Sequence, residues 1–185
     1  MPALAPGDPF PNLSLRTVDG EVELRERWEC GPLVVMFMRH FGCAFCREHL
    51  IEMGRAFGDF EAAGADVVAV FQYDAQATQR FCDGRDVPFD CLGDPDRAAY
   101  AAVSLGRGSP VQIVNPKVAI RFLGAARHGV FGGPPQGGDV AQLPGTFVVG
   151  RDGQVVLAHY SRSSADNPAV DDVLGAVRSA ADSGH

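Results

Sequence analysis

The sequence lacks the long apolar runs and the basic excess that would indicate a membrane or a nucleic acid as its partner. No apolar stretch approaches the roughly 20 residues that cross a bilayer as a helix. The first residues, MPALAPGDPFPNL, have neither the basic segment nor the apolar core of a signal peptide. The formal net charge of −7 argues against a general nucleic-acid binder, which would show a basic face. We therefore expect a cytoplasmic protein with no membrane and no nucleic-acid partner.

Internal repeats and low-complexity tracts are also missing, which excludes a repeat array and a disordered chain. The 185 residues are 46% hydrophobic and 21% charged, as is typical of a globular protein. This length is enough to bury a core within one ordinary domain. We expect a single domain over residues 1–185.

Cysteine is scarce and odd in number. The chain has five cysteines: Cys30, Cys43, Cys46, Cys82 and Cys91. An odd set in a cytoplasmic protein is not a disulfide framework, so we expect these thiols to be mostly reduced. The C-x-x-C spacing of Cys43 and Cys46 is typical of a redox motif where it lies near a βαβ unit.

A strand–helix–strand pattern surrounds this pair. GPLVVMFM, residues 31–38, is a continuous apolar run that suits a buried strand. The residues after Cys43 repeat apolar side chains at helical spacing: Leu50, Met53, Phe57 and Phe60. We expect Gly64 to end this helix, and DVVAVF, residues 66–71, to form a second buried strand. The two strands should be parallel, because a helix connects them.

The remaining chain alternates short strands and helices. Asp19-Gly20 and Asp152-Gly153 predict two hairpins, the second within residues 145–160, and residues 87–92 predict an extended segment. The Gly- and Pro-rich segment 129–139 must be a loop. Helices are expected over four ranges: 74–84, 94–105, 115–126 and 167–181. The sum is an α/β protein with a mixed central sheet and helices on both faces.

The cysteine pair lies where the first buried strand ends and a helix begins. The first turn of a helix has unpaired N–H groups that carry a partial positive charge, which favours a thiolate at Cys43. Arg39 and Arg47 add charge of the same sign. We expect Cys43 to be the attacking thiol and Cys46, one turn along the helix, to form a disulfide with it.

Two other interpretations of this pair stay open. His40, Cys43, Cys46 and His49 are four good zinc ligands, although structural zinc sites usually combine two ligand pairs that lie further apart in sequence. His49 falls within the helix, where it is compatible with a surface residue. The two cysteines are also compatible with small buried hydrophobic residues.

Several separated motifs, in order, resemble those of thioredoxin-fold, peroxiredoxin-like proteins of the AhpC/TSA-type group with a C-x-x-C motif. The resemblance covers roughly residues 5–181 and rests on these segments: PGDPFPNLSL, DGEVEL, RHFGCAFCRE and LPGTFVVGRDGQVVLAH. It implies a thioredoxin-like fold and a thiol-dependent oxidoreductase, a peroxiredoxin-like antioxidant whose cysteine pair cycles between dithiol and disulfide. The implied substrate is a small peroxide, a lipid endoperoxide or a disulfide. Thioredoxin or another dithiol is the implied reductant, no cofactor is needed, and a homodimer stays open.

The same resemblance assigns roles to individual residues. Arg39 joins Cys43 and Cys46 as a catalytic group. The residues expected to bind substrate are Phe41, Gly42, Pro144 and Gly145. The resemblance also implies a cis peptide bond before Pro144, packed against the cysteine pair.

The chain departs from the usual family pattern in one respect. Typical peroxiredoxins have a proline and a threonine or serine seven and three residues before the attacking cysteine, where they bind the peroxide. Here Met36 and His40 precede Cys43 at those positions, and Arg39 and Cys43 precede Cys46. This puts fast reduction of hydrogen peroxide in doubt. A protein disulfide reductase with little peroxidase activity, and a redox sensor or interaction module without turnover, are therefore the alternatives.

The other cysteines are assigned to the structure. We expect Cys91 in the core, with a resolving role in place of Cys46 as the alternative, and structural roles for Cys30 and Cys82. His159 is expected to be a hydrogen-bonded residue of a strand. The loop 129–139 is a candidate lid over Cys43, because it ends a few residues before Pro144.

Overall fold

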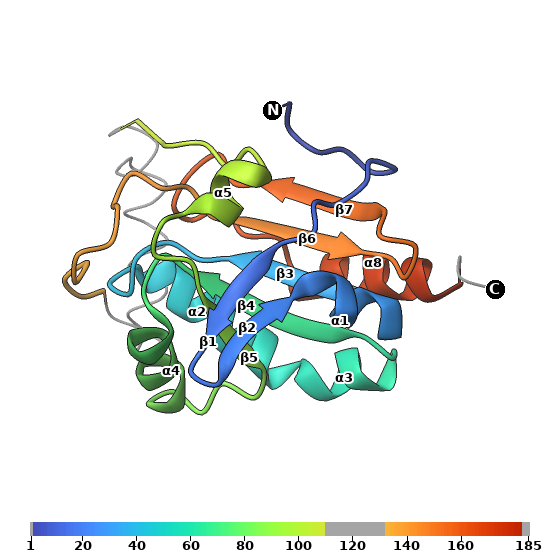
Figure 1. Cartoon of the computed structure of the whole chain (residues 1–185), viewed down its shortest axis with the longest axis horizontal. Coiled ribbons are helices and arrows are strands. Elements are labelled where there is room, and N and C mark those ends of the chain that lie inside the picture. The colour runs from blue at the N-terminus through green and yellow to red at the C-terminus, as the bar shows by residue number, and fades with distance from the viewer. Residues whose placement is uncertain (1, 110–131, 183–185) are drawn as a thin grey trace.

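The computed structural model describes residues 2–109 and 132–182, and its strands form one sheet in the order β2-β1-β5-β4-β3-β6-β7 (Figure 1). The strands are β1 Ser14–Thr17, β2 Gly20–Glu23, β3 Leu33–Phe37, β4 Asp66–Phe71, β5 Asp90–Gly93, β6 Gly145–Val149 and β7 Val155–Tyr160. The helices are α1 Leu24–Cys30, α2 Ala44–Arg55, α3 Phe57–Ala62, α4 Ala75–Asp83, α5 Ala98–Ala102 and α8 Val170–Asp182.

The centre of the sheet is the expected βαβ unit. Strands β3 and β4 are parallel, with partners that run from Leu33 opposite Asp66 to Phe37 opposite Val70. Strand β5 continues the parallel part beside β4, while β6 lies antiparallel to β3 and β7 antiparallel to β6. Both expected hairpins are confirmed, since β1 pairs with β2 and β6 with β7. The sheet is therefore mixed.

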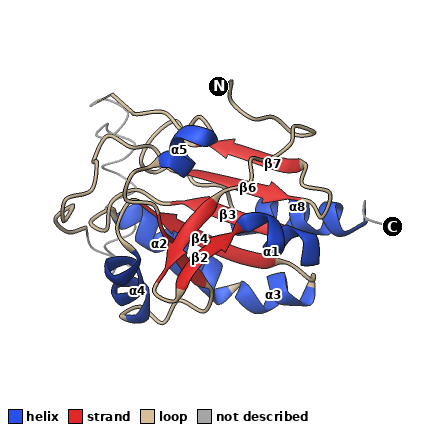
Figure 2. Ribbon diagram, in the orientation of Figure 1, coloured by secondary structure: helices blue, strands red, loops and turns tan. Residues whose placement is uncertain are grey.

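Helices cover both faces of this sheet (Figure 2). Because side chains alternate along a strand, Met36 and Ala69 point to one face, where they pack with residues of α2, α3, α4 and α8. Val35 and Val70 point to the other face and pack with α1, α5 and the N-terminal segment. The architecture confirms the expected α/β class, with a mixed sheet between two helical layers.

Two of the expected elements differ in extent, and a third cannot be compared. The long helix after Cys43 is divided at Ala56, whose φ of −90° and ψ of 2° separate α2 from α3, and it ends before Gly64 at a φ of +73°. The helix expected over 94–105 shrinks to α5, because Asp94 and Pro95 form a turn in which the Asp94 carboxylate accepts hydrogen bonds from two backbone N–H groups. The helix expected over 115–126 lies outside the described residues.

None of the helices within residues 2–109 and 132–182 is long and apolar enough to span a bilayer.

Candidate active site

Cys43 occupies the junction between a buried strand and a helix. It is the residue before the first turn of α2, with an extended backbone, and its N–H donates to the carbonyl of His40 at 3.0 Å. Its Sγ accepts a hydrogen bond from the N–H of Cys46 at 3.4 Å, as expected for a group that caps a helix N-terminus. Both thiols are free and almost fully buried. The pair thus lies where a buried strand ends and a helix begins, as the sequence predicted.

Arg39 connects Cys43 with a second segment of the chain. Its side chain is only 3% exposed, and Nη1 donates to Sγ of Cys43 at 3.5 Å. Nε donates to the carbonyl of Gln142 at 2.9 Å, and Nη2 donates to the carbonyl of Val140. The guanidinium therefore links the cysteine loop to the chain just before β6, more than a hundred residues away in sequence.

These contacts separate the two cysteines in acidity. A hydrogen bond with the Cys46 side chain, followed by the Arg39 charge and the Cys46 N–H, outweighs burial and lowers the pKa of Cys43 to about 6. Burial, together with its contact with Cys43, raises the pKa of Cys46 well above the ordinary thiol value. At neutral pH, Cys43 is mostly thiolate and Cys46 is a thiol. One nucleophile and one proton-bearing partner are the set that a dithiol–disulfide cycle requires.

Phe41 lies in the core rather than in open space. Its ring is stacked between Tyr73 and Phe81, with centroid distances of 3.7 and 4.2 Å, and its side chain is 3% exposed. Its N–H donates to Oη of Tyr73 at 3.1 Å, and its carbonyl accepts from Nε of Arg47 at 2.7 Å. These contacts hold the loop before Cys43 in place, whereas substrate binding by Phe41 stays a prediction.

Gly42 packs closely against the backbone of Gly133. Its carbonyl accepts a hydrogen bond from the N–H of Gly133 at 2.9 Å, and a Cβ on Gly42 would lie only 1.9 Å from the Gly133 oxygen. The Oη of Tyr73 donates to the carbonyl of Pro135 in the same segment. The described part of the loop expected at 129–139, residues 132–139, therefore packs on the cysteine loop. Its action as a lid stays a prediction.

The expectation of a cis bond at Pro144 is wrong. The peptide bond between Leu143 and Pro144 is trans, which is the form that an X–Pro bond favours intrinsically. In this form the carbonyl of Pro144 accepts from the N–H of Ser161 at 3.3 Å. Gly145 follows as the first residue of β6, opposite Phe37 of β3. The segment before Pro144 contacts the site through Val140 and Gln142, whose carbonyls accept hydrogen bonds from Arg39.

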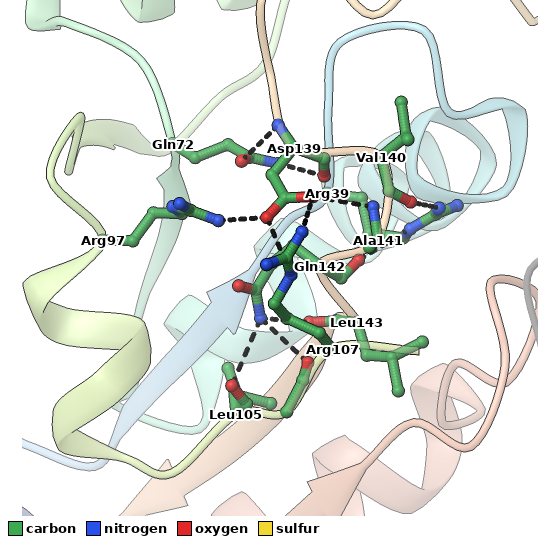
Figure 3. Close-up of polar contacts among 11 residues, drawn as sticks. Arg39, Gln72, Arg97, Leu105, Arg107, Asp139, Val140, Ala141, Gln142 and Leu143 are labelled. Carbon is green, nitrogen blue, oxygen red and sulfur yellow. Dashed lines mark hydrogen bonds and ion pairs between the residues drawn. The ribbon is translucent and has the colours of Figure 1, made fainter. Parts of the chain in front are cut away.

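A cluster around Asp139 fixes this second segment (Figure 3). The Asp139 carboxylate accepts from Arg97 and forms an ion pair with Nε of Arg107 at 3.1 Å. Its backbone N–H donates to Oε1 of Gln72 at 2.8 Å, and Nε2 of Gln72 returns a hydrogen bond to its carbonyl. Against burial, the hydrogen bonds from Ala141 and Arg97 lower the pKa of Asp139. The segment that holds Arg39 is thus itself tied to the ends of β4 and α5.

Sequence reasoning did not identify this cluster. Gln72 directly follows β4, so its place at the carboxyl end of a parallel strand was the one available signal. Asp139, Arg97 and Arg107 gave none, because nothing in their local sequence indicates that they meet.

The four candidate zinc ligands do not form a metal site. Within residues 2–109 and 132–182, no group of three or more His, Cys, Asp or Glu side chains is arranged to hold a metal ion. His49 is not a surface residue, since its side chain is only 3% exposed. Burial, followed by the charges of Arg39 and Arg47, lowers the pKa of His40 to about 4.

The expectation of reduced thiols is wrong for Cys82 and Cys91. Cys82 of α4 and Cys91 of β5 form a disulfide, with their Cα atoms 6.7 Å apart, and Cys30 is exposed and free. The two partners meet because the short connection after α4 turns the chain back along the sheet. His159 is hydrogen-bonded in β7 as expected, with Nε2 2.8 Å from the carbonyl of Asp166.

Comparisons with known proteins identify a family and a fold for this chain. Residues 53–163, more than half of the chain, match the family described as AhpC/TSA antioxidant enzyme. The matched residues begin after the cysteine pair, so the assignment of the pair rests on the site itself. The chain is 28% identical to the prostamide/prostaglandin F synthase of Danio rerio, over 87% of this chain and 82% of that protein.

Solved structures show the same fold at low sequence identity. A peroxiredoxin-like protein from Aquifex aeolicus superposes with a TM-score of 0.71 at 16% identity, covering 97% of this chain and 90% of the other. A putative thiol:disulfide interchange protein DsbE from Chlorobium tepidum gives 0.64 at 21% identity, covering 95% and 99%. Together they confirm the expected thioredoxin-like, peroxiredoxin-like fold.

Proposed function

This chain belongs to the AhpC/TSA antioxidant enzyme family, and we propose that it is a thiol-dependent oxidoreductase that reduces peroxides or related oxidants through Cys43 and Cys46. One observation carries the proposal. Sγ of Cys43 accepts hydrogen bonds from Nη1 of Arg39 and from the N–H of Cys46. Both donors favour the thiolate of Cys43, and the thiolate is the reactive form.

The proposed cycle begins with attack by the Cys43 thiolate on the oxygen–oxygen bond of a hydroperoxide. The thiolate takes up the terminal OH as a sulfenic acid, and the other oxygen leaves as an alkoxide that gains a proton to give the alcohol. The Arg39 guanidinium donates to the sulfur. In the proposed cycle it also stabilises the leaving oxygen, which lies beside that sulfur. The sulfur of Cys43 is thereby oxidised by two electrons.

Cys46 completes the cycle in the proposal. Its thiol attacks the sulfenic acid, a disulfide forms between Cys43 and Cys46, and the OH leaves with the thiol proton as water. An external dithiol such as thioredoxin then reduces the disulfide by exchange and is itself oxidised to a disulfide. We place this cycle in the cytoplasm, where such reductants keep thiols reduced.

A protein disulfide reductase is the second candidate. The positions where typical peroxiredoxins bind peroxide hold Met36, which is fully buried, and His40. The likeness in fold to the interchange protein supports the same alternative. In this reaction the Cys43 thiolate would attack a disulfide sulfur, and Cys46 would release the reduced substrate.

The test is a thiol count and peptide map of reduced protein after one equivalent of hydrogen peroxide, a lipid hydroperoxide or a protein disulfide. Rapid loss of two thiols in a Cys43–Cys46 peptide, reversed by thioredoxin over many cycles, is the expected result. Cys43→Ser should abolish turnover, and Cys46→Ser should accumulate sulfenic acid or mixed disulfide. Full activity of Cys43→Ser would contradict the assignment of the nucleophile. A single oxidation without turnover would instead identify a redox sensor.

A further inference from the structure

Two neutral carbonyl groups hold the Arg39 guanidinium at the sulfur of Cys43. Nε donates to the carbonyl of Gln142 at 2.9 Å and Nη2 to the carbonyl of Val140, while Nη1 donates to Sγ of Cys43. Among the residues that the structure describes, no carboxylate forms an ion pair with Arg39. The carbonyls therefore orient the planar guanidinium without cancelling its charge. Its position at the sulfur depends on where these two carbonyls lie.

The two carbonyls belong to a turn over residues 139–142, which precedes β6. The Asp139 carboxylate accepts a hydrogen bond from the N–H of Ala141 at 2.9 Å, and the Asp139 carbonyl accepts from the N–H of Gln142 at 3.2 Å. The buried Gln142 side chain anchors the end of the turn through hydrogen bonds to backbone carbonyls. The Val140 side chain is 47% exposed, so apolar burial contributes little to holding the first half of the turn. The position of the Val140 carbonyl therefore depends on the contacts of Asp139.

Asp139 ties this turn to two other parts of the molecule (Figure 3). Its side chain is 14% exposed, and its carboxylate accepts from Arg97 and forms an ion pair with Arg107 at 3.1 Å. Its backbone exchanges two hydrogen bonds with the side chain of Gln72, at the end of β4. Arg97 has a left-handed backbone with a φ of +56°, which is unfavourable for arginine and persists only where other contacts offset it. The ion pair with Asp139 is such a contact.

We propose that Asp139 is a positioning residue, whose carboxylate fixes the turn that holds Arg39 against the sulfur of Cys43. Asp139 acts through the carbonyls of Val140 and Gln142, which it places within reach of the guanidinium. The inference rests on the proposed function, because the redox cycle requires a reactive Cys43. Its test follows the titration of Cys43 rather than the turnover of an oxidant. A failure of this inference is therefore distinguishable from a failure of the proposed function.

The direction of the change separates positioning from simple loss of charge. A carboxylate disfavours a nearby thiolate, and Asp139→Asn also leaves Arg97 and Arg107 with one anionic partner fewer. By charge alone, Asp139→Asn would lower the pKa of Cys43. Loss of positioning raises that pKa instead, because the Arg39 guanidinium moves away from the sulfur. Asp139 keeps its charge during the titration, since hydrogen bonds hold its pKa, against the effect of burial, below the ordinary value.

The experiment is the rate of alkylation of Cys43 by iodoacetamide in the reduced full chain at a series of pH values, with peptide mapping to separate Cys43 from the other thiols. We expect Asp139→Asn to lower the rate at pH 6 about two- to fivefold, since partial loss of a charged hydrogen bond raises the pKa of Cys43 from about 6. Asp19→Asn is the control, because it removes an exposed carboxylate between β1 and β2, and it should leave the titration unchanged. A faster or an unchanged rate in Asp139→Asn would overturn the proposal.

Two further variants test the route through Arg39. In the Arg39→Gln background, Asp139→Asn should no longer slow the alkylation, since there is no guanidinium to position. Equal slowing in both backgrounds would contradict this route. Gln72→Met removes two hydrogen bonds to the Asp139 backbone without changing any charge, and it should slow the alkylation of Cys43 in the same direction. Should Asp139→Asn fail to fold, Gln72→Met decides alone, and an unchanged rate in that variant would overturn the proposal.

Discussion

At the scale of single residues, Arg39 is the charged group that lowers the pKa of Cys43, in addition to the hydrogen bonds from Cys46. Its Nη1 donates to the sulfur, and two backbone carbonyls hold its guanidinium in place. A lysine keeps the charge but cannot make these three contacts in fixed geometry, because its ammonium group is a single point of charge on a flexible stem. The position therefore requires the planar fork of an arginine rather than a positive charge alone.

Arg39→Lys should raise the pKa of Cys43 from about 6 toward the ordinary thiol value. The loss of one charged hydrogen bond corresponds to a thiolate fraction about two- to tenfold lower at pH 7. The pH dependence of alkylation of Cys43 by iodoacetamide measures this change. Arg47→Lys is the control, because Arg47 donates to the Phe41 carbonyl, and it should leave the titration unchanged. An unaltered pKa in Arg39→Lys would show that the hydrogen bonds from Cys46 suffice.

At the scale of elements, the loop before α2 and the segment 132–135 act as a pair. They approach so closely that Gly42 has no room for a side chain, and its substitution must displace the Gly133 backbone. The sequence alone gave no sign of this contact, because the two segments are about ninety residues apart. Any role of the 132–139 segment therefore involves its contact with the cysteine loop.

Gly42→Ala should therefore destabilise the protein by about 1–3 kcal/mol, as overpacking does elsewhere. It should also increase hydrogen exchange at Gly133, whose N–H loses its acceptor. Gly58→Ala is a matched control: Gly58 lies in α3 with open space around it, and alanine there should stabilise by about 0.5–1 kcal/mol. Urea unfolding measures both changes. Equal effects of the two substitutions would mean that the contact at Gly42 does not exist in solution.

The disulfide between α4 and β5 is the second feature at this scale. It closes a separation of nine residues, for which the loss of unfolded-chain entropy amounts to about 2–3 kcal/mol of stability. The double variant Cys82→Ser/Cys91→Ser should be less stable by about this amount, whereas Cys30→Ser, at an exposed free thiol, should not be. Acid-quenched alkylation followed by peptide mapping checks the bond itself. Recovery of both Cys82 and Cys91 as alkylated free thiols from the oxidised protein would exclude it.

At the scale of the whole molecule, the order of strands in the sheet determines which strand ends meet at the site. Strands β3 and β6 are adjacent, so the segment after β3 and the segment before β6 lie at the same edge of the sheet. The first carries Arg39 and Cys43, and the second carries the carbonyls that bind Arg39. The site therefore exists only when the sheet is assembled.

Folding holds the partly buried His40 and the buried His49 in neutral form, which makes global stability depend on pH. The pKa of each is lowered to about 4 from an ordinary value of 6.5, mainly by burial. The unfolded chain then binds more protons than the native state between these values, so stability is full above pH 6.5 and falls as the pH drops toward 4.

His49→Phe should flatten this dependence, because the fully buried ring contributes up to about 1.4 kcal/mol per pH unit in that range. Urea unfolding of both proteins at a series of pH values measures the slopes. The carboxylates titrate alike in the two proteins, so the difference isolates His49. Parallel curves for the parent and the variant would contradict a neutral, buried His49.

Several elements could be predicted because their causes are local. The strand at residues 66–71 has the bounds expected from its apolar run, and Cys43 lies directly before a helix, as the change of periodicity indicated. Gly64 ends the helical region with a positive φ. The trans bond at Pro144 was not predicted, because the expectation followed the family resemblance and not the intrinsic preference of an X–Pro bond. The Cys82–Cys91 disulfide was not predicted either, since cysteine pairing depends on how α4 and β5 pack.

The sequence by itself determined that a C-x-x-C pair would stand between a buried strand and a helix. That outcome depends on apolar periodicity and on helix N–H groups within four residues of Cys43. Only the tertiary structure decided which arginine reaches the sulfur and what holds it there. Arg39 is fixed by carbonyls of Val140 and Gln142, and Asp139 fixes their segment through Arg97 and Gln72. These contacts join parts of the chain that meet only in the folded sheet, so no local pattern could specify them.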